Sequence, residues 1–178
     1  MDLSHLKLDS TNTRAEIKKE GISGKGTFTT SFIAKGEIIL ATVGKKILVE
    51  EFDFLVPPNL ITYCFQIDKL HFLCPVDEKS LNGMFLVNHS CNPNCGIYKN
   101  NSLIAMRDIE TSEEITFDYA CCDAEYPGIP GAAFSTFQCQ CHTSECRNVI
   151  TGKDYQRKDL QNKYKGYFSE YIQDLISD

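Results

Sequence analysis

The chain has 178 residues, a net charge of −6 and an apolar share of 42%. These values are typical of a single globular domain and exclude a disordered or fibrous chain. No apolar run approaches the ~20 residues of a membrane-spanning helix, and the N-terminal residues lack a signal-peptide core. The negative charge argues against nucleic-acid binding, which needs clustered Lys and Arg. We therefore expect a protein of a reducing intracellular compartment, cytoplasm or nucleus, without nucleic-acid or membrane partners.

Up to about residue 120 the sequence predicts short β-strands separated by Gly, Pro and Asn. The segments with strand-like composition or alternation are 25–28, 37–40, 61–67, 72–74, 102–107 and 114–117. The first two flank a turn at Lys35-Gly36 and predict an early hairpin. The sequence YPGIPG at 126–131 predicts the end of the first compact unit.

The C-terminal part is different in kind. From Asp154, a plausible helix cap, apolar side chains recur at helical spacing and predict one amphipathic helix over 152–178 with its aromatic stripe in the core. The stripe consists of Leu160, Tyr164, Tyr167, Tyr171 and Leu175.

Residues 108–125 carry seven carboxylates and no Lys or Arg. Two interpretations are equally open. The stretch is either a solvated acidic face or a surface that attracts a cationic substrate.

Nine cysteines are an odd number for a disulfide framework, and a chain in a reducing compartment keeps its thiols reduced. Cys139, Cys141 and Cys146 place three thiols within eight residues. A structural zinc site needs four N or S ligands, so this triad is one ligand short. From the residues alone the fourth ligand is open. The candidates are His142, Cys95, Cys91 and Cys122.

Two further segments are unremarkable in isolation. NHSCNPNC at 88–95 is typical of a polar turn. EEITFDY at 113–119 is typical of a strand that ends in a core or edge tyrosine.

In combination these motifs point to a family. Gly24-Lys25-Gly26, then NHSCNPNC, EEITFDY and CxCx4C, resembles the SET-domain protein-lysine methyltransferases with a post-SET zinc motif, over roughly residues 20–150. The resemblance implies a mainly β (β-rich α+β) SET fold of small curved sheets with a knot-like C-terminal threading. It also implies an N-terminal segment (1–20) packed on the domain, a SET domain (21–121), a post-SET zinc-binding segment (122–151) and the C-terminal amphipathic helix (152–178).

The resemblance further implies transfer of methyl groups from S-adenosylmethionine to a lysine side-chain amine of a protein. By position, Lys25 and Gly26 would contact the cosubstrate, and Asn88 and His89 would hold it. A Lys-containing basic protein, histones included, would be the substrate partner; the sequence leaves the oligomeric state open. The alternatives are an inactive SET-fold module that binds basic peptides, and a methyltransferase acting on a non-protein amine.

Three aromatic residues have implied roles in the lysine channel. Tyr119 matches the catalytic tyrosine, and Phe117 matches the neighbouring aromatic position that affects how many methyls are added. Tyr63 is either a second channel aromatic or a core residue. A dry aromatic channel suits this chemistry, because it disfavours the ammonium form of the lysine.

For the metal, the resemblance implies a structural zinc held by Cys91, Cys139, Cys141 and Cys146. Cys95 is the main alternative ligand, and His142 is expected on the surface. The chain departs from the family pattern at Phe85, commonly arginine, and at Asn148, commonly glycine. Asn tolerates the left-handed conformation, so the turn at Asn148 is expected to persist.

Overall fold

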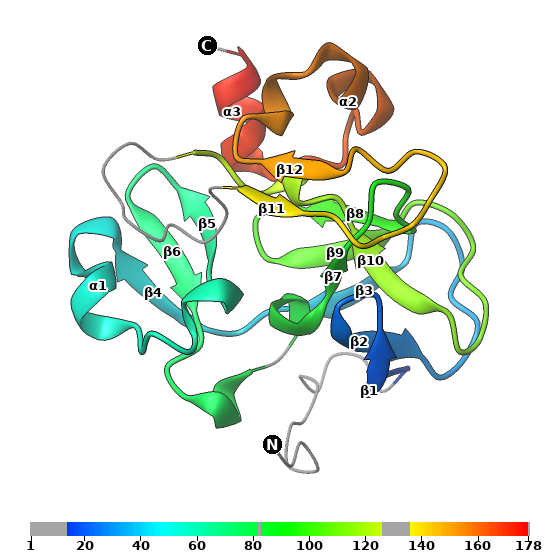
Figure 1. Ribbon diagram of the computed structural model, residues 1–178, viewed down its shortest axis with the longest axis horizontal. Helices are drawn as coiled ribbons and strands as arrows, with labels where there is room; N and C mark the ends of the chain where they lie inside the picture. The colour runs from blue at the N-terminus through cyan, green and yellow to red at the C-terminus, as the bar shows by residue number, and fades with distance from the viewer. Residues whose placement is uncertain (1–13, 82, 126–135, 178) are drawn as a thin grey trace.

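The computed structural model describes residues 14–81, 83–125 and 136–177, and its regular structure is mainly short strands, as predicted (Figure 1). The largest sheet has the order β1-β2-β10-β8-β9-β3, with β7 paired to β10 beside this path. Its members are β1 (Ala15–Gly21), β2 (Gly24–Thr29), β3 (Ile38–Ala41), β7 (Asn88–His89), β8 (Cys95–Tyr98), β9 (Ser102–Ala105) and β10 (Glu114–Phe117).

Two smaller sheets accompany it. One is antiparallel, with the order β4-β6-β5, and the other is the hairpin β11-β12. In Figure 1 the first lies to the left beside helix α1, and the second lies between the main sheet and the C-terminal helices. The elements are β4 (Lys45–Leu48), α1 (Phe52–Leu55), β5 (Phe65–Asp68), β6 (His71–Cys74), β11 (Thr136–Gln138) and β12 (Val149–Thr151).

A continuous apolar core joins the main sheet, the β4-β6-β5 sheet and the C-terminal segment. Ile115 and Phe117 of β10 are buried in it. Phe52 of α1 and Phe72 of β6 pack against each other, with ring centroids 4.8 Å apart. Burial of this apolar surface is the main stabilising contribution to the fold.

The predicted pairing of 25–28 with 37–40 is wrong. β2 pairs with β1 on one edge and with β10 on the other, so no edge is left for β3, which pairs with β9. The chain turns at Lys35-Gly36 as expected, with Gly36 at φ +87°. Ile33, just before that turn, bridges to Ile109 and carries the chain away from β2.

Of the two predicted strands at 61–67 and 72–74, the second is confirmed, whereas the first begins only at Phe65. Residues Ile61–Tyr63 form a 3₁₀ turn instead, in which Tyr63 donates its N–H to the Leu60 carbonyl at 3.0 Å. Tyr63 therefore lies on a turn ahead of β5.

The single helix predicted over 152–178 is also wrong. The structure has two short helices, α2 (Lys158–Lys163) and α3 (Glu170–Ser177), separated by a turn with Gly166 at φ +85°. A glycine in this conformation commonly ends a helix. Both helices lie over the β11-β12 hairpin (Figure 1), and the aromatic side chains of the stripe still pack on the core. Asp154 is not a helix cap but a buried partner of Arg147.

Part of the predicted organisation falls outside the described residues. This applies to residues 1–13 of the N-terminal segment and to the predicted turn at 126–131. Within the described ranges, no helix is long and apolar enough to cross a membrane.

Candidate active site

The polar turn at residues 88–91 and the C-terminal end of β10 meet through strand pairing. β10 pairs in parallel with β7, so that Thr116 lies opposite Asn88 and Phe117 opposite His89. The His89 and Tyr119 rings are 5.2 Å apart, edge to face. Two motifs separated by almost thirty residues are thereby placed at one point of the sheet.

The glycine turn between β1 and β2 is held against the same point by two side chains. The Asn88 amide donates to the Lys25 carbonyl at 2.6 Å and to Glu114 Oε1 at 2.7 Å. The other Glu114 oxygen accepts from the Ile22 N–H at 3.0 Å. A Cβ at Gly26 would overlap the Glu114 carboxylate, so a larger residue there would displace the side chain that holds the turn.

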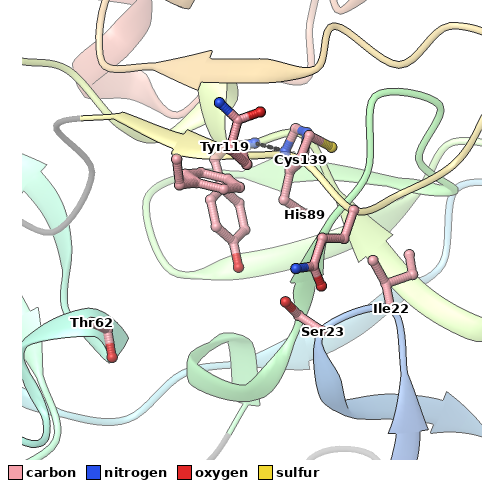
Figure 2. Close-up of a pocket in the computed structure, with 9 residues that line it drawn as sticks. Ile22, Ser23, Thr62, His89, Tyr119 and Cys139 are labelled. Carbon is pink, nitrogen blue, oxygen red and sulfur yellow. Dashed lines mark hydrogen bonds between the residues drawn. The ribbon is translucent and has the colours of Figure 1, made fainter.

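His89 links the backbone of Tyr119 to the cysteine cluster. Its Nδ1 accepts the Tyr119 backbone N–H at 3.2 Å, shown as the dashed line in Figure 2, and its Nε2 lies 3.3 Å from the Cys91 sulfur. Burial lowers the pKa of His89 to about 4, so the ring is neutral at pH 7. A neutral ring that accepts at Nδ1 carries its proton on Nε2, which then donates toward the Cys91 sulfur.

The Tyr119 ring packs against other aromatic rings, and its hydroxyl acts as a hydrogen-bond donor. The hydroxyl donates to the Val87 carbonyl at 3.0 Å. The Phe117 and Phe137 ring centroids lie 5.0 and 5.9 Å from the Tyr119 ring. Burial raises the pKa of Tyr119 above its ordinary value, so the group stays a phenol at pH 7. With its proton directed to Val87, the phenol oxygen can still accept a hydrogen bond.

Two adjoining cavities lie beside these residues. The first has a volume of about 330 Å³ and is lined by Ile22, Ser23, Thr62, His89, Tyr119 and Phe137, among others (Figure 2). In Figure 2 the Tyr119 hydroxyl points into the space between Thr62 and Ser23. The second has a volume of about 490 Å³ and is lined by Lys19, Ser23, Gly24, Lys25, Tyr63 and Leu86. Ser23 lines both, so the glycine turn forms a shared wall.

A third, narrow pocket of about 20 Å³ also borders Tyr119. It shares Thr62 and Tyr119 with the 330 Å³ cavity and Tyr63 with the 490 Å³ cavity. Half of its described lining residues are aromatic, namely Tyr63, Phe65, Phe85, Phe117 and Tyr119. The structure therefore brings Tyr63, Phe117 and Tyr119 to one pocket, whose described lining does not include His89.

The four thiols of Cys91, Cys139, Cys141 and Cys146 lie within 4.8 Å of one another. A tetrahedral zinc with Zn–S bonds of about 2.3 Å places its sulfurs about 3.8 Å apart, and the Cys91 and Cys139 sulfurs are 3.9 Å apart. Backbone N–H groups of Arg147 and Asn148 also donate to sulfurs of this cluster, at 3.3 and 3.4 Å. The donor set fits a structural zinc ion.

The open alternatives for the fourth ligand fit less well. Cys95 is fully buried on β8 and donates its S–H to Asn94 Oδ1 at 3.4 Å, away from the other thiols. His142 is exposed, as expected. Asn148 adopts φ +63°, so the expected left-handed turn persists with asparagine in place of glycine.

Arg147 is a site residue that no sequence motif identified. Its guanidinium makes two hydrogen bonds to Asp118, at 2.6 and 2.8 Å, and one to Asp154 at 3.0 Å. All three side chains are at most 8% exposed. Asp118 caps the 3₁₀ turn at Tyr119–Cys121 by accepting the Ala120 N–H. Arg147 therefore ties the cysteine cluster to the backbone that carries Tyr119.

The acidic stretch 108–125 is not one exposed face. Asp118 and Asp123 are buried, Glu113 pairs with Arg107, and Glu114 supports the glycine turn. The exposed carboxylates are those of Asp108, Glu110 and Glu125. Composition alone missed this outcome, because partners such as Arg107 and Arg147 lie outside the stretch.

The comparisons with known proteins agree with this geometry. Residues 24–120 match the model of the SET domain. The chain is 32% identical to the histone-lysine N-methyltransferase ash1 of Drosophila melanogaster, over 77% of this chain and 6% of that protein. It is 26% identical to the histone-lysine N-methyltransferase SUV39H1-A of Danio rerio, over 75% of this chain and 40% of that protein. It is also 26% identical to the histone-lysine N-methyltransferase ASHH2 of Arabidopsis thaliana, over 75% of this chain and 8% of that protein.

The chain thus spans at most 40% of the length of these three relatives. The matched region contains the glycine turn, the Asn88-His89 turn and the segment ending in Tyr119. The protein belongs to the SET domain family.

Proposed function

We propose that this protein transfers methyl groups from S-adenosylmethionine to the side-chain amine of a lysine in a protein substrate. The observation that carries the proposal is the place of Tyr119 between the 330 Å³ cavity and the narrow aromatic pocket. A cosubstrate in the cavity and an amine in the pocket would meet at this ring. Such alignment is what a direct displacement requires.

The two larger cavities suit the cosubstrate. S-adenosylmethionine supplies a methyl group on a positively charged sulfur. In the first cavity, Ile22 and Phe137 offer apolar contacts for an adenine. In the second, Lys19 and Lys25 offer positive charge for an amino-acid carboxylate. Asn88 and His89 hold the walls between them through Lys25, Glu114 and Tyr119.

The narrow pocket suits a lysine head group. Only a neutral amine has the lone pair that attacks the methyl, and an aromatic wall of Tyr63, Phe117 and Tyr119 disfavours the charged form. The Tyr119 oxygen would accept one amine N–H, because its own proton is donated to Val87. Tyr119 would then orient the amine, and no protein nucleophile would be needed.

The substrate class rests on the relatives. All three are named histone-lysine N-methyltransferases, so histones are the first substrates to test, and a nuclear location would follow. The alternative, an inactive module that holds basic peptides on an acidic face, has less support, since most carboxylates of the stretch 108–125 are buried or paired.

Incubation with labelled S-adenosylmethionine tests the proposal. The acceptors are core histones, other basic proteins and free lysine or a polyamine. Label on protein lysines, located by mass spectrometry, is the expected result. Calorimetric binding of S-adenosylmethionine without transfer to any acceptor would favour the module, and label on the small amines alone would favour a non-protein acceptor.

Replacing Phe117 with Tyr is expected to shift the product toward monomethyllysine. Phe117 is 4% exposed and lines the narrow pocket. An added hydroxyl would occupy space in a pocket of about 20 Å³ and could hydrogen-bond the amine. Mass spectrometry of a peptide at full turnover measures the shift. An identical methyl distribution from both proteins would remove Phe117 from this role.

Cys91, Cys139, Cys141 and Cys146 are proposed to hold one structural zinc ion per chain, and Cys139→Ser is expected to lose it. Metal binding to a site made on folding contributes to folding free energy, so the variant should also unfold at lower temperature. Elemental analysis and a thermal melt measure both effects. Cys95→Ser is the matched control and should keep its zinc. A wild-type protein that is folded without metal would contradict the proposal.

A further inference from the structure

Among the described residues that line the narrow pocket, Asp123 is the one that carries a carboxyl group. Asp123 is 7% exposed, and it lies two residues after the end of the 3₁₀ turn Tyr119–Cys121. The Asp123 N–H donates to the Tyr119 carbonyl at 2.9 Å. This hydrogen bond holds the Asp123 main chain against the turn that carries Tyr119.

This carboxyl has no cationic partner in the pocket. Of the described residues that line it, none is Lys, Arg or His. Asp123 Oδ1 accepts a weak hydrogen bond from the Cys122 thiol at 3.5 Å. Two nearby cationic side chains form ion pairs with other acids: Arg147 pairs with Asp118, and Lys153 pairs with Glu125.

A carboxyl in this setting is costly unless it has a role. Burial without a cation destabilises the ionised form, and burial accordingly raises the pKa of Asp123. A buried carboxyl with a strong local cause for its shift, placed in a pocket, is a candidate for function. Apart from the weak thiol bond, the Asp123 carboxyl makes no hydrogen bond or ion pair with the described part of the chain.

The size of the pocket restricts what reaches Asp123. About 20 Å³ holds one group of the size of a water molecule. An amine head group has that size, and it carries the N–H donors that a carboxyl oxygen accepts. A carboxyl oxygen accepts an N–H from an ammonium and from a neutral amine alike.

We infer that Asp123 is a contact of the acceptor amine in this pocket and limits how many methyl groups the lysine receives. This inference rests on the proposed methyl transfer. An amine that donates one N–H to Asp123 and one to Tyr119 keeps its lone pair free for the methyl. Each methyl replaces an N–H, so a neutral monomethylated amine can satisfy only one of the two acceptors. A neutral dimethylated amine satisfies neither, which disfavours transfer of the third methyl.

The test compares peptides whose lysine carries zero, one or two methyl groups. Wild-type protein should show a kcat/KM at least about tenfold lower for the dimethylated peptide than for the unmethylated one, which corresponds to the loss of about one hydrogen bond. In Asp123→Leu the ratio of kcat/KM for the unmethylated peptide to kcat/KM for the dimethylated peptide should fall toward one, and trimethyllysine should accumulate. Asp123→Asn keeps an acceptor oxygen and should retain most of the wild-type preference.

The matched control is Glu125→Leu, an exposed acid two residues further along the chain; it should keep the wild-type ratio. Zinc content, thermal midpoint and calorimetric binding of S-adenosylmethionine verify folding of each variant. If Asp123→Leu does not fold, the affinity of the wild-type protein for methylated peptides tests the inference instead. In the presence of S-adenosylhomocysteine, the unmethylated peptide should bind about tenfold more tightly than the trimethylated one.

The outcomes separate the two proposals. If wild-type protein methylates no protein lysine, the proposed function and this inference both fail. If it does, but Asp123→Leu keeps the wild-type ratio, or wild-type binds both peptides equally, only the role of Asp123 is overturned.

Discussion

Replacing Tyr119 with Phe is expected to lower kcat by about 100-fold or more, with little change in the affinity for S-adenosylmethionine. The change removes one preorganised hydrogen-bonding group at the reacting centre, and losses of about 10²–10³ in kcat are typical of such deletions. The ring, which borders both the cavity and the pocket, stays in place. Single-turnover methylation of a peptide gives the rate, and calorimetry gives the cosubstrate affinity.

The matched control is Tyr98→Phe, which removes the hydroxyl of a tyrosine 40% exposed at the end of β8. Its kcat should equal that of the wild type. The role of Tyr119 is contradicted if Tyr119→Phe keeps kcat within about twofold of wild type, because one lost hydrogen bond to a charged group corresponds to tenfold or more.

Replacing Arg147 with Met is expected to lower the free energy of unfolding by about 3–5 kcal/mol, the usual cost of removing one partner from a buried ion pair. The variant keeps most of the side-chain length but leaves Asp118 and Asp154, which are 0% and 8% exposed, without their cation. Urea unfolding measures the change. Activity should fall as well, because Asp118 caps the turn that carries Tyr119.

Arg157→Met is the control for this prediction. Arg157 makes a comparable ion pair with Asp159, but both side chains are about half exposed, at 47% and 63%. Exposed ion pairs contribute about 0–1 kcal/mol to the free energy of unfolding, so Arg157→Met should lower it by no more than that. Equal losses in the two variants would mean that the Arg147 network does not hold the C-terminal segment to the sheet.

Much of the architecture could be predicted, because it depends on local pattern. Alternation at 102–107 and 114–117 predicted β9 and β10, and the structure confirms both. The pairing of β2 could not be predicted in the same way. Its partners β1 and β10 lie on either side of it in the sheet, and a turn signal at Lys35-Gly36 contains no information on long-range neighbours.

The helix prediction failed for a different reason. The apolar spacing from Leu160 to Leu175 is helical, and it predicted the buried face correctly. A single glycine, Gly166, interrupts the helix between Tyr164 and Ser169. The periodicity of side chains records which face is buried, but it does not exclude a turn that preserves that face.

The sequence by itself determined the family, the mainly β class and the four cysteines that the fold brings together, because motif order and ligand chemistry can be read from residue types. Only the tertiary structure decided what the charged residues do. Parallel pairing of β10 with β7 places Tyr119 beside His89, and the buried ion pair with Arg147 compensates the charge of Asp118. Asp123 is buried at the same place without a cation. The energy of a charge depends on its burial and its partners, and long-range contacts set both.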